Sequence, residues 1–411
     1  MMRLHRSWRY EQELSTDISC SPGRRVTASV RRHCGSRPRV HRCAHCNSGR
    51  AGLDPSDRPR HDGEHFHLRQ CCGHHEQFER VQFVGKQRHQ WIALLERESR
   101  WREQLVMNAS EVWNDWSCRV RVTVQRPAAL SAAKRQLVEI MDDVARAANR
   151  FDPHSDISRV NAAAGRMIPV GSRTIGLLDA ALDAAAETGG AVDPTIGRHL
   201  LQAGYDEDIE IVRGRGEATQ HSNLPLPRAD WTSVRIDHAF GLVGVPEGVA
   251  LDLGATAKAM TADIAAMSIS SNLGTPVLVE IGGDVSVCGK TPAGWLIAVA
   301  EKSGGPGQTV TLTRGGLATS STIARRWRAG DADQHHIIDP RTGSPATGPW
   351  RTVSVWADTA VQANTASTAA LVLGPGAEHY LREMSFAARL VAVDGNIRTI
   401  GNWPTEAAVA S

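Results

Sequence analysis

A break in composition near residue 100 is the sequence feature that most constrains the fold of this chain. Residues 1–100 carry 19 Lys and Arg against 11 Asp and Glu, and they hold ten of the 17 His and six of the eight Cys. The rest of the chain carries 28 basic and 33 acidic side chains. A change this sharp marks a boundary. Because Met107 stands just before the first regular pattern, we treat 1–106 as an extension and 107–411 as the main domain.

The basic, Cys- and His-rich extension is open to three interpretations. It lacks sustained apolar periodicity, so we expect low order or disorder, because such a segment cannot bury enough apolar surface. The same composition is typical of translated upstream DNA, and a true start at Met107 is therefore a second hypothesis. A zinc site is the third and weakest. Cys43 and Cys46 have the spacing of half a site, and the other ligands would come from His65, His67, Cys71, Cys72, His74 and His75.

Composition excludes several classes of function. Apolar residues make up 41% and charged residues 22%, which is typical of a globular protein. No apolar run approaches the length of a membrane-spanning helix, and no basic motif with aromatics indicates nucleic-acid binding. Residues 1–30 lack the apolar core of a secretory signal. With Cys118 and Cys288 as the only thiols after residue 100, we expect a cytoplasmic protein.

The main domain has the pattern of an α+β fold. Val120, Val122 and Val124 alternate with polar residues, which predicts a half-buried strand. Apolar spacing predicts helices over 130–149, 174–187, 258–268 and 362–373. Further strands are expected at 233–236, 277–281, 295–300, 309–312, 352–356 and 388–393. Strands and helices do not alternate strictly, which favours mixed sheets with flanking helices over a parallel βαβ fold.

Segments rich in Gly, Asp, Ser and Thr stand at the ends of these elements. Residues 251–258 place a Lys at a helix start, a pattern that favours an anion site, although neither G-x4-G-K nor G-x-G-x-x-G is present. Asp193 could accept a hydrogen bond from a ligand or cap its own turn. The other segments that could carry chemistry are 151–161, 189–197, 280–284, 316–321, 335–343 and 362–374.

Two of these segments carry candidate catalytic and metal-binding groups. His336 is a candidate general base, because imidazole titrates near neutral pH. Asn364 and Thr368 are four residues apart on an expected helix, so their oxygens face one side. Oxygen ligands of this kind suit Mg²⁺ better than zinc.

Taken in order, these segments resemble the FAD:protein FMN transferase family, the ApbE-type flavin transferases, over roughly residues 112–395. The run His-Ile-Ile-Asp-Pro-Arg-Thr-Gly that begins at His336 is the most specific part. The resemblance implies an enzyme that uses FAD and Mg²⁺, moves FMN onto a Thr or Ser hydroxyl of an acceptor protein and releases AMP. It also implies an acceptor with an Asp-x-x-Ser/Thr-Gly-Ala-Ser/Thr context, which this chain lacks.

The resemblance assigns roles position by position. It implies that His336 acts in catalysis. It implies FAD contacts at Phe151, Ala191, Val192, Asp193, Asp252, Lys258 and Ile337. It implies a metal held by the carbonyl of Ala255 and by Asn364, Ser367 and Thr368.

Two departures from the family pattern bear on function. Asn364 stands where the family usually has Asp, and we expect weaker metal binding, because hard-cation affinity depends on ligand charge. Ser117 and Cys118 replace the small-residue entry that the family has before its first strand, which leaves a flavin contact there open. Two alternatives stand beside transfer. A Mg²⁺-dependent FAD pyrophosphatase giving FMN and AMP would use the same site, and nothing in the sequence separates it from a transferase. A non-catalytic FAD-binding protein is the other alternative, and Asn364 favours it.

Overall fold

The computed structural model describes residues 108–215, 226–291, 293–301, 305–329 and 332–404, together with the backbone of four earlier strands. Contacts between Cα atoms divide the chain into residues 1–83 and 84–411. In the first unit, β1 (Ser15–Cys20) pairs with β2 (Arg24–Ser29), and β3 (Phe66–Gln70) pairs with β4 (Gln77–Val81). Apart from these four strands, the extension for which we expected low order lies outside the described residues. Cys43 and Cys46 of the predicted zinc site lie outside them too.

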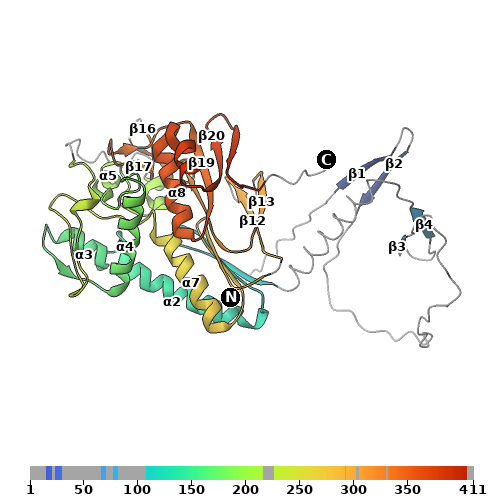
Figure 1. Ribbon diagram of the computed structural model, residues 1–411, viewed down its shortest axis with the longest axis horizontal. Coiled ribbons are helices and arrows are strands. Elements are labelled where there is room, and N and C mark those ends of the chain that lie inside the picture. Colours follow the sequence, from blue (N-terminus) through green and yellow to red (C-terminus); the bar gives the residue numbers. More distant parts are fainter. Residues whose placement is uncertain are drawn as a thin grey trace, which may run out of the picture. The chain divides into compact units, whose positions relative to one another are not determined.

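An eight-stranded antiparallel sheet forms the centre of the second unit. Its order is β21-β20-β19-β14-β11-β10-β6-β5, and α7 and α8 pack against it side by side (Figure 1). The strands are β5 (Ala109–Asp115), β6 (Cys118–Val124), β10 (Val277–Ile281), β11 (Asp284–Cys288), β14 (Gly315–Ser321), β19 (Trp350–Ala357), β20 (Ala387–Ala392) and β21 (Ile397–Ile400). Three long helices contact this sheet: α2 (Leu130–Ala148), α7 (Ala257–Leu273) and α8 (Ala360–Leu373).

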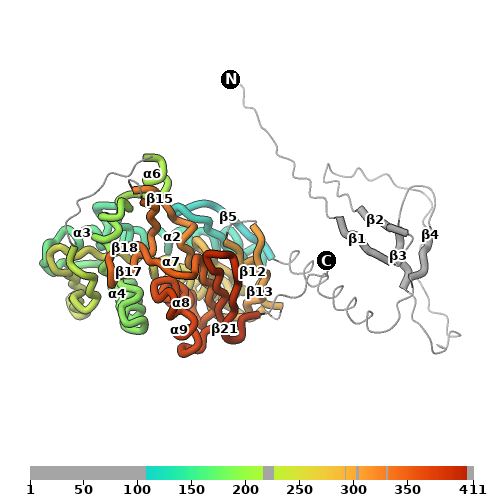
Figure 2. Tube along the Cα trace, turned by 90° about the horizontal axis from the view of Figure 1, so that it is seen from above, coloured from blue at the N-terminus to red at the C-terminus, as the bar shows by residue number. Residues whose placement is uncertain are grey.

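Shorter helices and hairpins lie around the central sheet and its helices (Figure 2). The remaining strands form a three-stranded sheet, β7 (Ile168–Pro169), β9 (Leu242–Gly244) and β8 (Arg235–Asp237), and three hairpins, β12 (Trp295–Ala300) with β13 (Gly307–Leu312), β15 (Arg326–Ala329) with β16 (Ala332–His335), and β17 (Ile338–Asp339) with β18 (Ser344–Pro345). The other helices are α3 (Asp156–Ala162), α4 (Ser172–Glu187), α5 (Gly197–Gln202), α6 (Ile209–Gly214) and α9 (Ala377–Glu383), with 3-10 turns η1 (Pro127–Ala129), η2 (Trp231–Ser233) and η3 (Gly374–Gly376).

The predicted α+β fold is confirmed. Helices appear at each of the four expected positions, and the strands expected at 277–281 and 295–300 have those bounds. The strand expected from residue 233 begins only at Arg235, because Asp230 caps a 3-10 turn that ends at Ser233. No helix within the described ranges is long and apolar enough to cross a membrane.

Helix α8 differs from α2 in how its side chains are buried. Helix α2 is amphipathic, with Leu137, Met141 and Val144 buried along one face. Helix α8 is buried nearly all round, and its Ala, Ser and Thr side chains are small enough for strands and neighbouring helices to approach it closely. The sheet, α7 and α8 are therefore packed tightly against one another.

Strand β14 shows how close this packing is. A Cβ atom added at Gly316 would lie 2.2 Å from the backbone nitrogen of Ala360 at the start of α8. We expect Gly316→Ala to lower the free energy of unfolding by about 3 kcal/mol, because backbone cannot yield as a side chain does. Gly214→Ala is the control, since nothing lies within 4 Å of its added Cβ. Urea unfolding of both variants checks this, and equal midpoints would contradict it.

Candidate active site

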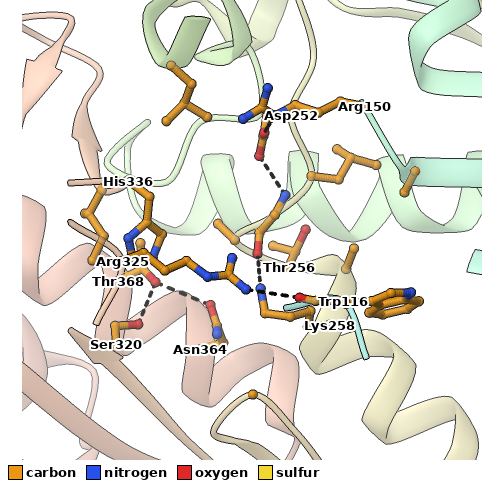
Figure 3. Close-up of a pocket in the computed structure, with 18 of the residues that line it drawn as sticks. Trp116, Arg150, Asp252, Thr256, Lys258, Ser320, Arg325, His336, Asn364 and Thr368 are labelled. Carbon is orange, nitrogen blue, oxygen red and sulfur yellow. Dashed lines mark hydrogen bonds and ion pairs between the residues drawn. The ribbon is translucent and has the colours of Figure 1, made fainter. Parts of the chain in front are cut away.

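A cavity of about 450 Å³ opens beside the amino-terminal end of α7 and the first turns of α8 (Figure 3). Its walls come from Ala181 and from segments far apart in the sequence: residues 116–118, 144–151, 191–208, 252–258, 282–284, 319–325, 336–338 and 364–368. Of the predicted site residues, the structure brings these to the cavity wall: Phe151, Ala191, Val192, Asp193, Asp252, Ala255, Lys258, His336, Ile337, Asn364 and Thr368. Only Ser367 stands apart from them.

One wall is the loop that leads into α7. Lys258 donates from Nζ to the carbonyl oxygen of Gly254 at 2.8 Å, and Asp252 accepts from the Gly254 N–H at 2.8 Å. Burial lowers the pKa of the Lys258 ammonium, and the nearby Arg325 guanidinium lowers it further, while Asp284 opposes both. A cation held against a helix start makes this wall suited to an anion.

A second wall is aromatic. The Arg150 guanidinium lies 4.2 Å above the Phe151 ring centroid and 4.7 Å above that of Tyr205. Tyr205 stacks on Trp327 with centroids 5.1 Å apart. Arg150 is also paired with Asp252, Nε to Oδ2, at 2.6 Å. Phe151 was predicted as a ring contact, whereas Arg150 and Tyr205 were missed because no local pattern marks them.

The third wall joins α8 to the β10–β11 turn. Asn364 donates from Nδ2 to Asp284 Oδ1 at 2.7 Å, and its Oδ1 accepts from the Thr368 hydroxyl at 3.3 Å. Asp284 was missed as a site residue, although its segment, 280–284, was among those expected to carry chemistry. Burial raises the pKa of Asp284 to about 6, although the Lys258 ammonium favours the carboxylate. This wall therefore holds the one carboxyl group of Asp284, and a second carboxylate at position 364 would repel it.

Ser367 lies behind this wall. It is fully buried, donates to the Asn364 carbonyl oxygen at 3.0 Å and shares a hydrogen bond with Ser320 at 2.8 Å. Ser320 itself reaches Thr368 at 2.9 Å. The structure therefore places Ser367 one layer away from the predicted metal-binding oxygens and gives it the role of holding Asn364 and Thr368 in place.

Helix α8 is fixed to α7 by a half-buried carboxylate. Asp263 of α7 accepts from the N–H groups of Ala360 and Val361, each at 3.0 Å, and from the Ser286 hydroxyl at 2.6 Å. Burial raises the pKa of Asp263, and these three donors counteract the rise. The start of α8 is thereby capped from another helix, which sets where Asn364 lies.

The two adjacent histidines have different surroundings. His336 lines the cavity, and its Nδ1 is buried with no hydrogen-bond partner among the described residues. Burial, followed by the charges of Arg325 and Lys258, holds the pKa of His336 well below its usual value. His335 instead contacts the Ala346 carbonyl oxygen through Nε2 at 3.1 Å and does not line the cavity. His336 is therefore the histidine that can act on a bound molecule, in its neutral form.

The motif that follows His336 is mainly structural. Arg341 pairs with Asp339, Nη2 to Oδ2 at 2.8 Å, and donates to the carbonyl oxygen of Val372 near the end of α8 at 3.0 Å. Neither residue lines the cavity. The ion pair lowers the pKa of Asp339 against the opposing effect of burial. These contacts fix the segment that carries His336 and Ile337 to α8.

Asp193 has its carboxylate committed to its own turn. Oδ1 accepts from the N–H of Thr195 at 2.7 Å and from its hydroxyl at 2.6 Å, and Oδ2 accepts from the N–H of Trp231 at 3.2 Å. Of the two roles left open by the sequence, the structure shows the cap. Its neighbours Ala191 and Val192 are small and buried, which keeps space at the cavity wall.

Two hairpin turns complete the cavity. Trp116 and Ser117, between β5 and β6, both have left-handed backbone, with φ of 48° and 53°. Gly282, in the β10–β11 turn, has φ of 62°, and a Cβ there would lie 3.0 Å from Cys118 Sγ. Left-handed pairs are the geometry of tight hairpins, which favour Asn and Gly. Ser117 and Cys118, which depart from the family pattern, thus belong to a strained turn at the cavity wall.

Comparison with known families decides the relationship. A family model described as the ApbE family matches residues 115–384, which contain the whole cavity wall. The chain belongs to the ApbE family. This confirms the resemblance expected from the ordered segments, and it places the match within the part of the chain that follows the composition break.

Curated relatives and solved structures agree with this ApbE assignment. A Treponema pallidum protein named FAD:protein FMN transferase is 30% identical over 283 residues, 62% of this chain and 76% of that protein. An Escherichia coli K12 protein of the same name is 24% identical, over 56% of this chain and 67% of its own. The crystal structure of the ApbE protein of Thermotoga maritima superposes with a TM-score of 0.62 at 26% identity, covering 71% of this chain and 96% of that one.

Proposed function

We propose that this ApbE-family chain transfers FMN from FAD to a Thr or Ser hydroxyl of an acceptor protein and releases AMP, with Mg²⁺. The observation that carries the proposal is one cavity in which His336, Lys258 and the Asp284–Asn364 pair converge. The names of the curated relatives, FAD:protein FMN transferase, support it. We keep the acceptor context, Asp-x-x-Ser/Thr-Gly-Ala-Ser/Thr, and a cytoplasmic location as predictions.

Each wall of the cavity has a part in this reaction. The aromatic wall around Phe151 and Tyr205 suits a planar ring system, and the α7 wall with Lys258 suits the phosphates. The acceptor oxygen forms a bond to the FMN phosphorus, and the bond from that phosphorus to the AMP oxygen breaks. Neutral His336 takes the hydroxyl proton, and Lys258 offsets charge on the phosphate oxygens.

The residues at the α8 wall fit a hard cation of modest affinity. Within the described ranges no group of three His, Cys, Asp or Glu converges as a metal site. The oxygens available are the Asp284 carboxylate, the Asn364 amide, the Thr368 hydroxyl and the Ala255 carbonyl. Oxygen ligands suit Mg²⁺, which commonly binds through one or two carboxylates and the substrate phosphates. When bound, Mg²⁺ would neutralise charge on the phosphates.

Asp284 also bears on the alternative of a non-catalytic FAD carrier. That alternative rested on the missing carboxylate at position 364. The Asp284 carboxylate, 2.7 Å from the Asn364 amide, supplies a negative charge at the same wall. This geometry favours an enzyme over a carrier.

The test uses the full chain with FAD, Mg²⁺ and a tagged acceptor protein that carries Asp-Ala-Ala-Thr-Gly-Ala-Thr. We expect covalent flavin fluorescence on the acceptor in a denaturing gel, with one AMP released per label. A matched acceptor with Ala at the fourth position should stay unlabelled. AMP and FMN without labelling would establish the pyrophosphatase, in which water replaces the acceptor hydroxyl. Bound FAD without AMP would establish the carrier.

A further inference from the structure

Arg325 lines the cavity, although no motif in the sequence pointed to it. It lies in the loop between β14 and β15, lines the cavity and is half-buried. Figure 3 shows its side chain running from beside His336 toward Lys258 and Trp116. Its guanidinium therefore reaches the wall that suits an anion.

The guanidinium of Arg325 has little to bind within the protein. Its hydrogen bond is a long one, 3.4 Å from Nη2 to the carbonyl oxygen of Trp116. In the described part of the chain no carboxylate lies within ion-pairing distance of it. The adjacent Arg326, by contrast, is exposed and pairs with Asp333 at 3.3 Å. Arg325 thus keeps most of its five donors available at the cavity.

Its position beside another cation is costly unless an anion enters. Arg325, Lys258 and His336 line the same cavity, and the charge of Arg325 lowers the pKa of both other groups. Asp252 is paired with Arg150, and Asp284, which accepts a hydrogen bond from the neutral Asn364 amide, offsets the effect of Arg325 on the pKa of Lys258 only in part. Two like charges at a half-buried wall repel each other, and a bound anion would remove that repulsion.

We propose that Arg325 binds the pyrophosphate of FAD, together with Lys258. The proposal rests on the proposed function, because FAD is the anion that function requires. The planar fork of a guanidinium matches phosphate oxygens with two parallel hydrogen bonds, which an ammonium cannot do. Arg325 would therefore add orientation as well as charge and hold the pyrophosphate near His336.

The experiment measures FAD and riboflavin affinity of the full chain by calorimetry in EDTA, so that metal makes no contribution. We expect Arg325→Gln to weaken FAD binding about tenfold or more, the loss of a charge-assisted contact. Arg325→Lys should regain part of it, and the control Arg326→Gln should match the wild type. Riboflavin, which has no phosphate, should bind all four proteins alike.

The outcomes separate this inference from the proposed function. Wild-type FAD affinity in Arg325→Gln would overturn the inference and leave the proposed function standing. An equal loss for FAD and riboflavin would also overturn it, because the residue would then only shape the cavity through Trp116. A wild-type chain that binds no FAD in EDTA or in MgCl2 would overturn the proposed function itself.

Discussion

Replacing His336 with Gln is expected to lower FMN transfer by about two to four orders of magnitude, the usual contribution of a general base. His336 lines the cavity, and its Nδ1 has no protein partner among the described residues, so no neighbour can take over its task. FAD affinity should change little, because the proposed phosphate contacts come from other residues. Single-turnover AMP release and FAD calorimetry on the same preparation separate the two effects.

The pH dependence of transfer provides a second readout of the same base. Burial and the cations Arg325 and Lys258 hold the pKa of His336 well below 6.5. A base with a lowered pKa stays neutral as the pH falls to 6.5 and is lost only when the pH falls below its own pKa. We therefore expect the base-dependent part of kcat to hold down to pH 6.5. A decline centred at 6.5 or above would contradict the assignment.

His335→Gln is the matched control for this prediction. His335 is adjacent in sequence, but it contacts the Ala346 carbonyl oxygen and lies away from the cavity wall. Its replacement should lower stability more than turnover. If both variants lost turnover equally, the effect would come from disturbing the segment, and His336 would not be the base.

Replacing Asn364 with Asp is expected to change stability in opposite directions without and with Mg²⁺. The new carboxylate would take the place of an amide that donates to Asp284 at 2.7 Å. Two buried acceptors would then face each other, which costs about 1–3 kcal/mol or more in the free energy of unfolding. A hard cation between them removes that repulsion and gains a charged ligand, so Mg²⁺ should bind more tightly.

Thermal unfolding in EDTA and in MgCl2, with calorimetry of Mg²⁺ binding, measures both effects. We expect Asn364→Asp to melt lower than the wild type in EDTA and to gain more from Mg²⁺. Asp284→Asn should bind Mg²⁺ more weakly than the wild type. The double variant, which moves the carboxylate to position 364, should recover most of the affinity. If Asn364→Asp left the Mg²⁺ dependence of turnover and of melting unchanged, this account would be wrong.

The elements predicted from the sequence are those whose apolar spacing or strand propensity indicates how they are buried. Apolar spacing located α2, and the run of β-branched residues located β10 with its bounds. Strand β14 was missed because its Gly, Ala and Ser residues have low strand propensity. Those small residues are required by the contact with α8, where an added Cβ at Gly316 would meet backbone. Packing between distant elements, rather than local preference, decides that strand.

The site was predictable where its residues sit in distinctive segments. The ordered resemblance selected His336, Lys258 and Asn364, and the structure brings these three residues to one cavity. Arg325 and Asp284 were missed for a physical reason: segments far away in the chain decide what surrounds each of them. Asp284 and Asn364 are 80 residues apart in sequence, and an Arg in a loop is usually solvated. Only the folded structure shows that no carboxylate among the described residues forms an ion pair with Arg325.

The cap that Asp263 places on α8 links the two halves of the site during folding. Helix α8 has its first N–H groups satisfied by a carboxylate of α7, so α8 loses this stabilisation whenever α7 opens. The two helices should consequently open and close as one cooperative unit. Lys258 on α7 and Asn364 on α8 then reach their positions in the same event. A partly folded chain would not present a half-formed site to free flavin nucleotides.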